Sequence, residues 1–199
     1  MKLPKKNLKT TGNDNFVKVI TEKVSFWQIQ AGKKIIVGLD GTSGIGKSTI
    51  AKQISLNNPN ITVVHLDQFA FPLKQRFKKL KNTQDKPSIY QNGWYNIRKF
   101  KKIIGIKYNL KNQVLLVDGV FLQNNDIFSD IFDKHIFITT DQKVITVRRK
   151  RRFNLKYPNR NKDGNKIMSL IFDVAWKRYV EKYQPEKNAD FIINMIIKN

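Results

Sequence analysis

Cysteine is absent from the 199-residue chain. Disulfide bonds and zinc sites built from thiolates are therefore excluded, and we expect a reducing, cytoplasmic location. Long hydrophobic runs are also missing, since no window approaches the roughly eighteen apolar residues of a transmembrane helix. The basic start, MKLPKKNLKT, is not followed by the apolar stretch of a secretory signal. We therefore expect no membrane partner.

Acidic residues are scarce, with 15 Asp and Glu against 38 Lys and Arg and a formal net charge of +23. Such a charge attracts anions: nucleic acid, an acidic membrane or the phosphates of a nucleotide. Lysine and asparagine are abundant along the whole chain, so a compositional bias explains the charge equally well. The charge alone leaves the partner open.

Short apolar runs alternate with stretches of helical spacing along the chain. Buried strands are expected over 33–40, 61–67, 113–119, 134–140 and 189–196. Helices are expected over 15–30, 47–56, 94–106, 141–154 and 167–183. We expect residues 1–13 to be loose, and residues 68–93 to form a broken helix and a long loop. The pattern predicts a single α/β domain over 1–199, with a mostly parallel five-stranded sheet flanked by helices.

The stretch GLDGTSGIGKST follows a predicted strand and opens a predicted helix. It fits the motif G-x-x-x-x-G-K-[ST], in which glycines let backbone N–H groups approach an anion at a helix N-terminus. A chance glycine turn that caps a helix is the alternative, and the strand and helix context argues against it. We expect the donor phosphates of ATP or GTP to be bound by Gly41, Thr42, Ser43, Gly44, Ile45, Gly46, Lys47, Ser48 and Thr49.

The chemistry of the motif assigns two side chains within it. Lys47 would neutralise the β- and γ-phosphates, and the Ser48 hydroxyl would be a ligand of Mg²⁺. Asp67 and Asp118 end the second and third predicted strands, so both should lie near the phosphate loop. The alternative for each aspartate is a cap on the turn or helix that follows.

The order of GTSGIGKST, HLDQFAFP, VLLVDGVF, VRRKRRF and KRYVEKYQPEKNADFII resembles the uridine kinase and phosphoribulokinase group of P-loop kinases. The resemblance covers residues 34–196 and implies a three-layer P-loop fold with an arginine-rich lid at about 148–166. It implies that Asp67 deprotonates the acceptor hydroxyl and that Asp118 helps Ser48 to hold magnesium. It also implies lid arginines at Arg148, Arg149 and Arg152. This basic run could instead bind nucleic acid or form a solvated helix face.

The sequence departs from the family at substrate-facing positions. Ala70 stands where uridine kinases carry tyrosine, and Phe153 stands where an aspartate often follows the arginines. The stretch SIYQNGWYN contains no acid or histidine. Its aromatic residues, Tyr90, Trp94 and Tyr95, either stack on a substrate ring or belong to the core. His65 is expected to be packed within its strand and His135 to be exposed.

The sequence therefore predicts a Mg²⁺-dependent kinase that phosphorylates a hydroxyl of a small metabolite, with uridine or cytidine as the favoured acceptor. An enzyme for another alcohol, such as pantothenate, ribosylnicotinamide or glycerate, is the first alternative. A basic P-loop protein that binds RNA or DNA is the second.

Overall fold

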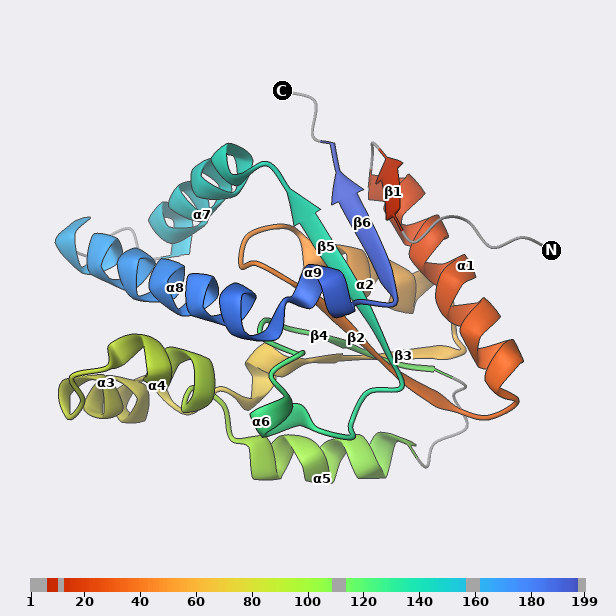
Figure 1. Cartoon of the computed structure of the whole chain (residues 1–199), viewed down its shortest axis with the longest axis horizontal. Coiled ribbons are helices and arrows are strands. Elements are labelled where there is room, and N and C mark those ends of the chain that lie inside the picture. The colour runs from red at the N-terminus through yellow and green to blue at the C-terminus, as the bar shows by residue number, and fades with distance from the viewer. Residues whose placement is uncertain (1–6, 11–12, 109–113, 157–161, 197–199) are drawn as a thin grey trace.

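A computed structural model describes residues 7–10, 13–108, 114–156 and 162–196 of the chain (Figure 1). Its centre is a sheet of six strands in the order β1-β6-β5-β2-β4-β3, and every strand pair is parallel. The strands are β1 (Asn7–Thr10), β2 (Ile35–Gly41), β3 (Ile61–His65), β4 (Val114–Asp118), β5 (Lys134–Thr140) and β6 (Phe191–Met195). The α/β fold and its five predicted strands are confirmed. The short edge strand β1 was not predicted.

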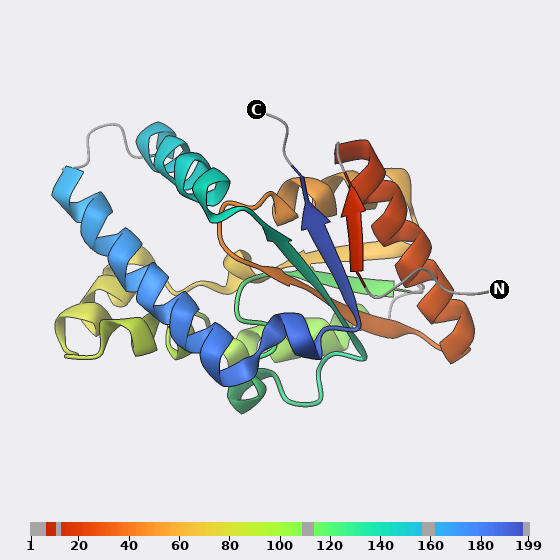
Figure 2. The ribbon, with the colours of Figure 1, turned by 45° about the horizontal axis from the view of Figure 1, so that its top comes forward.

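Helices lie on both sides of the sheet (Figures 1 and 2). They are α1 (Asn13–Ala31), α2 (Lys47–Asn57), the 3₁₀ turn η1 (Leu66–Phe69), α3 (Leu73–Lys81), α4 (Lys86–Asn92), α5 (Ile97–Tyr108), α6 (Asn125–Phe128), α7 (Gln142–Lys156), α8 (Lys162–Tyr183) and α9 (Pro185–Asn188). Among the helices of the described part of the chain, none has the length and apolarity to cross a bilayer.

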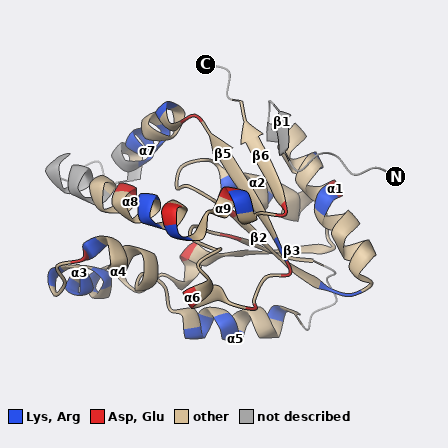
Figure 3. Cartoon of the chain, viewed as in Figure 1, with Lys and Arg blue, Asp and Glu red and all other residues tan. Residues whose placement is uncertain are grey.

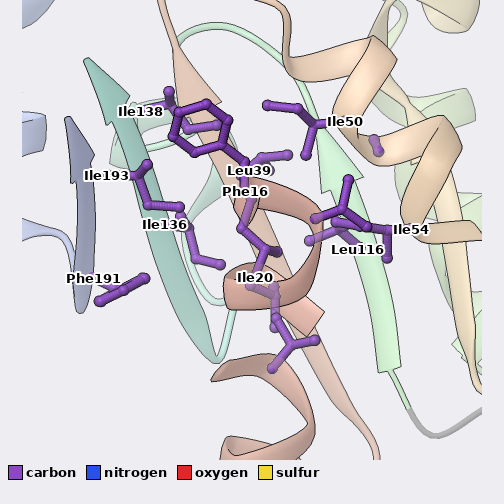
Figure 4. Close-up of a cluster of buried hydrophobic side chains, with 14 of the residues drawn as sticks. Phe16, Ile20, Leu39, Ile50, Ile54, Leu116, Ile136, Ile138, Phe191 and Ile193 are labelled. Carbon is purple, nitrogen blue, oxygen red and sulfur yellow. The ribbon is translucent and has the colours of Figure 1, made fainter. Parts of the chain in front are cut away.

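The core under α1 and α2 is made mainly of aliphatic side chains that face one side of the sheet (Figure 4). Phe16 and Ile20 of α1 and Ile50 and Ile54 of α2 are at most 1% exposed. They pack on alternate strand residues such as Leu116, because successive side chains of a strand point to opposite faces. Burial on this scale supplies the main stabilisation of the layer, at about 1.5–3 kcal/mol for each large apolar side chain.

The other face of the sheet is covered by aromatic side chains. Leu115 and Val117 of β4 point into this second cluster. The cluster includes Phe100 of α5, Tyr179 of α8 and Phe121, which lies between β4 and α6. Phe121 lies against Tyr179 with ring centroids 5.2 Å apart in an edge-to-face arrangement. The two clusters make the strands apolar on both faces, as the continuous apolar runs predicted.

Residues 68–93 differ from the prediction of a broken helix with a long loop. They form η1 and two helices, α3 and α4. Pro72 is the N-cap of α3, and Pro87 lies in the first turn of α4. Proline is tolerated at both places because the first N–H groups of a helix have no intrahelical partner. The prolines therefore mark helix starts here rather than breaks.

The sheet brings the chemistry-bearing residues to one edge. β2 is central, with β4 on one side and β5 on the other, and the chain order reverses across it. Ligands of open α/β sheets bind beyond the carboxyl ends of the strands at such a switch point. Gly41, Asp118 and His65 end β2, β4 and β3, so they meet at this edge.

Candidate active site

The phosphate loop joins the end of β2 to the start of α2. Gly44 and Gly46 have φ angles of 87° and 109°, in the region that favours glycine, and Gly46 is the N-cap of α2. Ile45 between them is fully buried and anchors the loop in the core. The loop therefore has the strand-to-helix geometry that the motif predicted.

Lys47 spans the phosphate loop from its first helical position. Its Nζ donates hydrogen bonds to the carbonyl oxygens of Gly41 at 2.7 Å and Thr42 at 3.0 Å, and the residue is only 6% exposed. Burial lowers the pKa of Lys47, and the charges of Asp40, Asp118 and Asp67 oppose this effect. A cation thus sits at the base of the loop, where an anion would be attracted.

A cavity of about 380 Å³ opens above the loop. Among the predicted site residues, its walls include Ser43, Gly44, Gly46, Lys47, Ser48, Thr49, Asp67, Asp118, Arg148 and Arg152. Gly41, Thr42, Ile45 and Arg149 do not line it. His65, Tyr90, Tyr95, Gly119 and Val120 complete the wall. The structure therefore brings most of the predicted residues together around one cavity.

Ser48 and Asp118 lie in direct contact at this cavity. Ser48 Oγ donates a hydrogen bond to Asp118 Oδ2 at 2.7 Å, and Asp118 is 4% exposed. Hydroxyl and carboxylate oxygens are the ligand type that Mg²⁺ prefers. In the described part of the chain, no group of three or more His, Cys, Asp and Glu could hold a metal. Two oxygen ligands fit an ion that is carried into the site largely by nucleotide phosphates.

Asp67 lies in η1, two residues after β3 ends, rather than in the strand itself. Its carboxylate is exposed to the cavity and accepts a hydrogen bond from the Tyr95 hydroxyl at 3.0 Å. Burial and the nearby Asp67 charge raise the pKa of Tyr95, which keeps the phenol protonated as a donor. Asp67 is thus an oriented carboxylate with one oxygen left for another partner.

The aromatic residues of SIYQNGWYN divide between the cavity and the core. Tyr90 and Tyr95 line the cavity. Trp94 does not, and the guanidinium carbon of Arg76 lies 4.6 Å from the centroid of its ring. Asn92 of this stretch is engaged away from the cavity, since its Oδ1 accepts a hydrogen bond from Asn124 Nδ2 at 2.9 Å. The cavity wall beside Asp67 is therefore aromatic rather than amide-lined.

The lid arginines point in two directions. Arg148 and Arg152 are four residues apart on α7, share one helix face and line the cavity. Arg149 lies about a quarter-turn further round the helix. Its Nη1 is 2.5 Å from Asp173 Oδ1 of α8, and its guanidinium carbon is 4.8 Å from the Phe172 ring centroid. In this structure the Arg149 side chain packs on α8 and does not line the cavity, and its contact with the transferred phosphoryl group stays a prediction. Residues 157–161 of the predicted lid lie outside the described residues.

Sequence reasoning missed two polar residues at the site. His65 lines the cavity, with Nδ1 in contact with Asp118 Oδ1, and is not simply packed within its strand. Asp40 is fully buried and accepts hydrogen bonds from Gly41 N at 2.7 Å and from the Tyr179 hydroxyl. Burial raises the pKa of Asp40 to about 6. In the sequence, the sign that could have identified both residues is that each is a polar residue within or at the end of an apolar strand run.

Two of the comparisons with known proteins extend over most of the chain. A uridine kinase of Clostridium tetani is 23% identical over 186 residues, which cover 81% of this chain and 87% of the relative. The structure of a possible uridine kinase from Bacillus stearothermophilus superposes with a TM-score of 0.64 at 16% identity, covering 90% of this chain and 98% of that one.

A more distant structure has the same fold. D-glycerate 3-kinase from Cryptococcus neoformans superposes with a TM-score of 0.60 at 9% identity, over 91% of this chain and 95% of its own. The family model of the parvovirus non-structural protein NS1 matches residues 8–114, a stretch that includes the phosphate loop but ends before Asp118 and the lid. The chain therefore belongs, over residues 8–114, to the family of the parvovirus NS1 model, and over most of its length it is similar to uridine kinases and has the α/β fold of the P-loop kinase structures compared above.

Proposed function

We propose that this protein is a magnesium-dependent kinase that transfers the γ-phosphoryl group of ATP or GTP to a hydroxyl of a small metabolite, with uridine or cytidine as the favoured acceptor. The observation that carries the proposal is the position of Asp67 in the same cavity as the phosphate loop, with Tyr95 donating to its carboxylate. An acceptor hydroxyl between Asp67 and the loop would face the donor's terminal phosphate.

In this mechanism each side chain has one task. Asp67 accepts the proton of the acceptor hydroxyl as its oxygen bonds to the γ-phosphorus, and the bond to the leaving ADP or GDP oxygen breaks. Lys47, Arg148 and Arg152 stabilise the charge spread over the phosphoryl oxygens. Ser48 and Asp118 would hold Mg²⁺, which neutralises charge on the β- and γ-phosphates when bound.

The test is release of ADP or GDP by the purified protein against a panel of acceptors. Uridine and cytidine represent nucleosides; pantothenate, ribosylnicotinamide and glycerate represent other alcohols. Turnover on a nucleoside above the acceptor-free rate supports the favoured acceptor. Turnover confined to another alcohol moves the assignment to the second acceptor class. Absence of nucleotide binding with Mg²⁺ present would remove the kinase proposal altogether.

One feature of the cavity wall supports the second acceptor class, alcohols other than nucleosides. Ala70 pairs with Tyr95 through a backbone bridge and brings no hydroxyl of its own. Asparagine and glutamine are missing from the described lining, so few neutral groups could pair with the edge of a base. These features suit a smaller or charged alcohol, which the same panel detects.

Binding of RNA or DNA is the remaining candidate, and it has one specific observation in its favour. Helices α3 and α5 carry lysine and arginine without a single acid (Figure 3). Contacts to phosphates of nucleic acid weaken steeply as salt rises. A gel-shift titration across salt concentrations tests this candidate, and absence of a shift at physiological salt would remove it.

A further inference from the structure

His65 and Asp118 occupy matching positions on neighbouring strands. β3 and β4 run parallel with His65 opposite Asp118 in the register, so their side chains leave the sheet on the same face. Both residues end their strands at the edge that holds the phosphate loop. The contact between them is therefore fixed by the backbone of the sheet rather than by a loop.

The two oxygens of the Asp118 carboxylate have different partners. Oδ1 contacts the Nδ1 atom of His65, and Oδ2 accepts the hydrogen bond from Ser48 Oγ. The Ser48 hydroxyl has a single hydrogen, and donating it to Asp118 leaves its lone pairs for a cation. Asp118 is thus clamped between the first turn of α2 and the end of β3.

We propose that His65 is a positioning residue that holds Asp118 in the orientation in which it binds the magnesium ion of the nucleotide or a water molecule of that ion. The inference rests on the proposed kinase function. His65 acts through Asp118 and does not itself transfer a proton. Residues that orient a metal ligand in this way typically change metal affinity or activity by about 10–100-fold when they are lost.

The surroundings of His65 argue against a packing role alone. Its strand neighbours Val63 and Val64 belong to the apolar clusters, whereas the imidazole is 31% exposed and lines the cavity. An aliphatic residue would extend the apolar run of β3 equally well. The imidazole adds a nitrogen at the one place where Asp118 has a free oxygen.

The nitrogen that makes the contact allows a sharp design. Asparagine places its amide nitrogen near the position of histidine Nδ1, whereas glutamine reaches the position of Nε2. Since the contact is through Nδ1, His65→Asn should preserve it and His65→Gln should not. His65→Ala removes it, and His135→Asn is a matched control, because His135 lies on β5 and does not line the cavity.

The experiment measures ATP binding by calorimetry for the full chain and each variant, once with excess Mg²⁺ and once with EDTA. For the unaltered protein we expect Mg²⁺ to strengthen ATP binding. In His65→Ala this gain should shrink by about 10–100-fold while affinity in EDTA is unchanged. His65→Asn and His135→Asn should keep most of the gain, and His65→Gln should lose it.

An unchanged gain in His65→Ala, or equal rescue by Asn and Gln, would overturn the positioning role. Loss of the gain in His135→Asn would also overturn it. If circular dichroism shows that His65→Ala does not fold, the comparison of His65→Asn with His65→Gln decides whether His65 positions Asp118. Failure of the unaltered protein to bind MgATP would defeat the proposed function as well. Normal MgATP binding with an insensitive His65→Ala defeats only this inference.

Discussion

Arg149 of α7 and Asp173 of α8 form an ion pair, while Arg148 beside Arg149 faces the cavity and donates to the Ile45 carbonyl at 3.2 Å. Adjacent residues of one helix thus serve different surfaces. Arg149 Cγ also lies 2.9 Å from where a Cβ on Gly44 would stand, so the lid packs closely on the phosphate loop. The pair holds α7 against α8 near the phosphate loop.

The lid arginines should separate into two classes when replaced. Arg152→Ala should lower turnover by about 10²–10³-fold, because it removes a cation from the transferring phosphoryl group. Arg149→Ala should mainly loosen α7, and Asp173→Ala should reproduce its effect. Steady-state kinetics together with limited proteolysis of α7 measure the two effects. Severe loss of turnover in Arg149→Ala but not in Asp173→Ala would mean that Arg149 reaches the substrate.

Replacement of Asp67 by asparagine tests the general base. Turnover should fall by about 10²–10⁴-fold, the usual contribution of a positioned base. ATP affinity should stay near that of the unaltered protein, because Asp67 contacts Tyr95 rather than the phosphate loop. Single-turnover kinetics and calorimetry separate the two quantities. Near-normal turnover would show that another group accepts the proton.

Lys47→Ala should weaken both binding and turnover. Its Nζ bridges the Gly41 and Thr42 carbonyls and is the buried cation of the loop. Loss of a charged donor to the transition state costs about 10²–10³-fold in turnover. Equilibrium dialysis with ATP and Mg²⁺ gives the affinity, and Lys52→Ala on the same helix is the control. ATP binding that survives unchanged would move the donor site away from this loop.

The pH dependence of stability should reveal Asp40. Burial raises its pKa from an ordinary value near 3.8 to about 6, so the folded state holds a proton that the unfolded state has released between these pH values. Stability from this group therefore falls as pH rises from about 4 to about 6 and is level above that. Asp40→Asn should remove this pH dependence. The free energy of unfolding of Asp40→Asn, relative to that of the unaltered protein, should therefore be up to about 3 kcal/mol higher at pH 7 than at pH 4.

The measurement is chemical unfolding of the unaltered protein and Asp40→Asn at several pH values. Burial lowers the pKa of His135 to about 4, and this group acts in the opposite direction over the same window. The difference between the two proteins isolates Asp40 from His135. A difference that does not change with pH would mean that Asp40 titrates normally in the folded state.

The sequence predicted the sheet and the phosphate loop because both depend on local pattern. Apolar runs such as Val114–Asp118 report burial on both faces, and the spacing of Gly41, Gly46 and Lys47 is fixed by the turn that binds phosphate. In a parallel sheet the carboxyl ends of β2 and β4 lie at the same edge. Asp118 beside Ser48 follows from that rule, and the structure has the pair in contact.

The parts that sequence could not supply depend on tertiary packing. The direction of Arg149 is set by Asp173 and Phe172 of α8, which are more than 20 residues away. The contact of His65 with Asp118, which are 53 residues apart in the chain, requires the register of β3 with β4. The partner of Asp40, Tyr179, lies 139 residues further along the chain.

The pairing of Asn7 with Ile192 has a consequence for biosynthesis. β1 is the first described strand along the chain, and it finds its neighbour only when β6, the last described strand, has been made. Until then β5 forms one edge of the sheet. Once β6 has been made, it pairs with β5 on one side and with β1 on the other. Translation that stalls before about residue 190 would therefore leave an open sheet rim able to pair with other nascent chains.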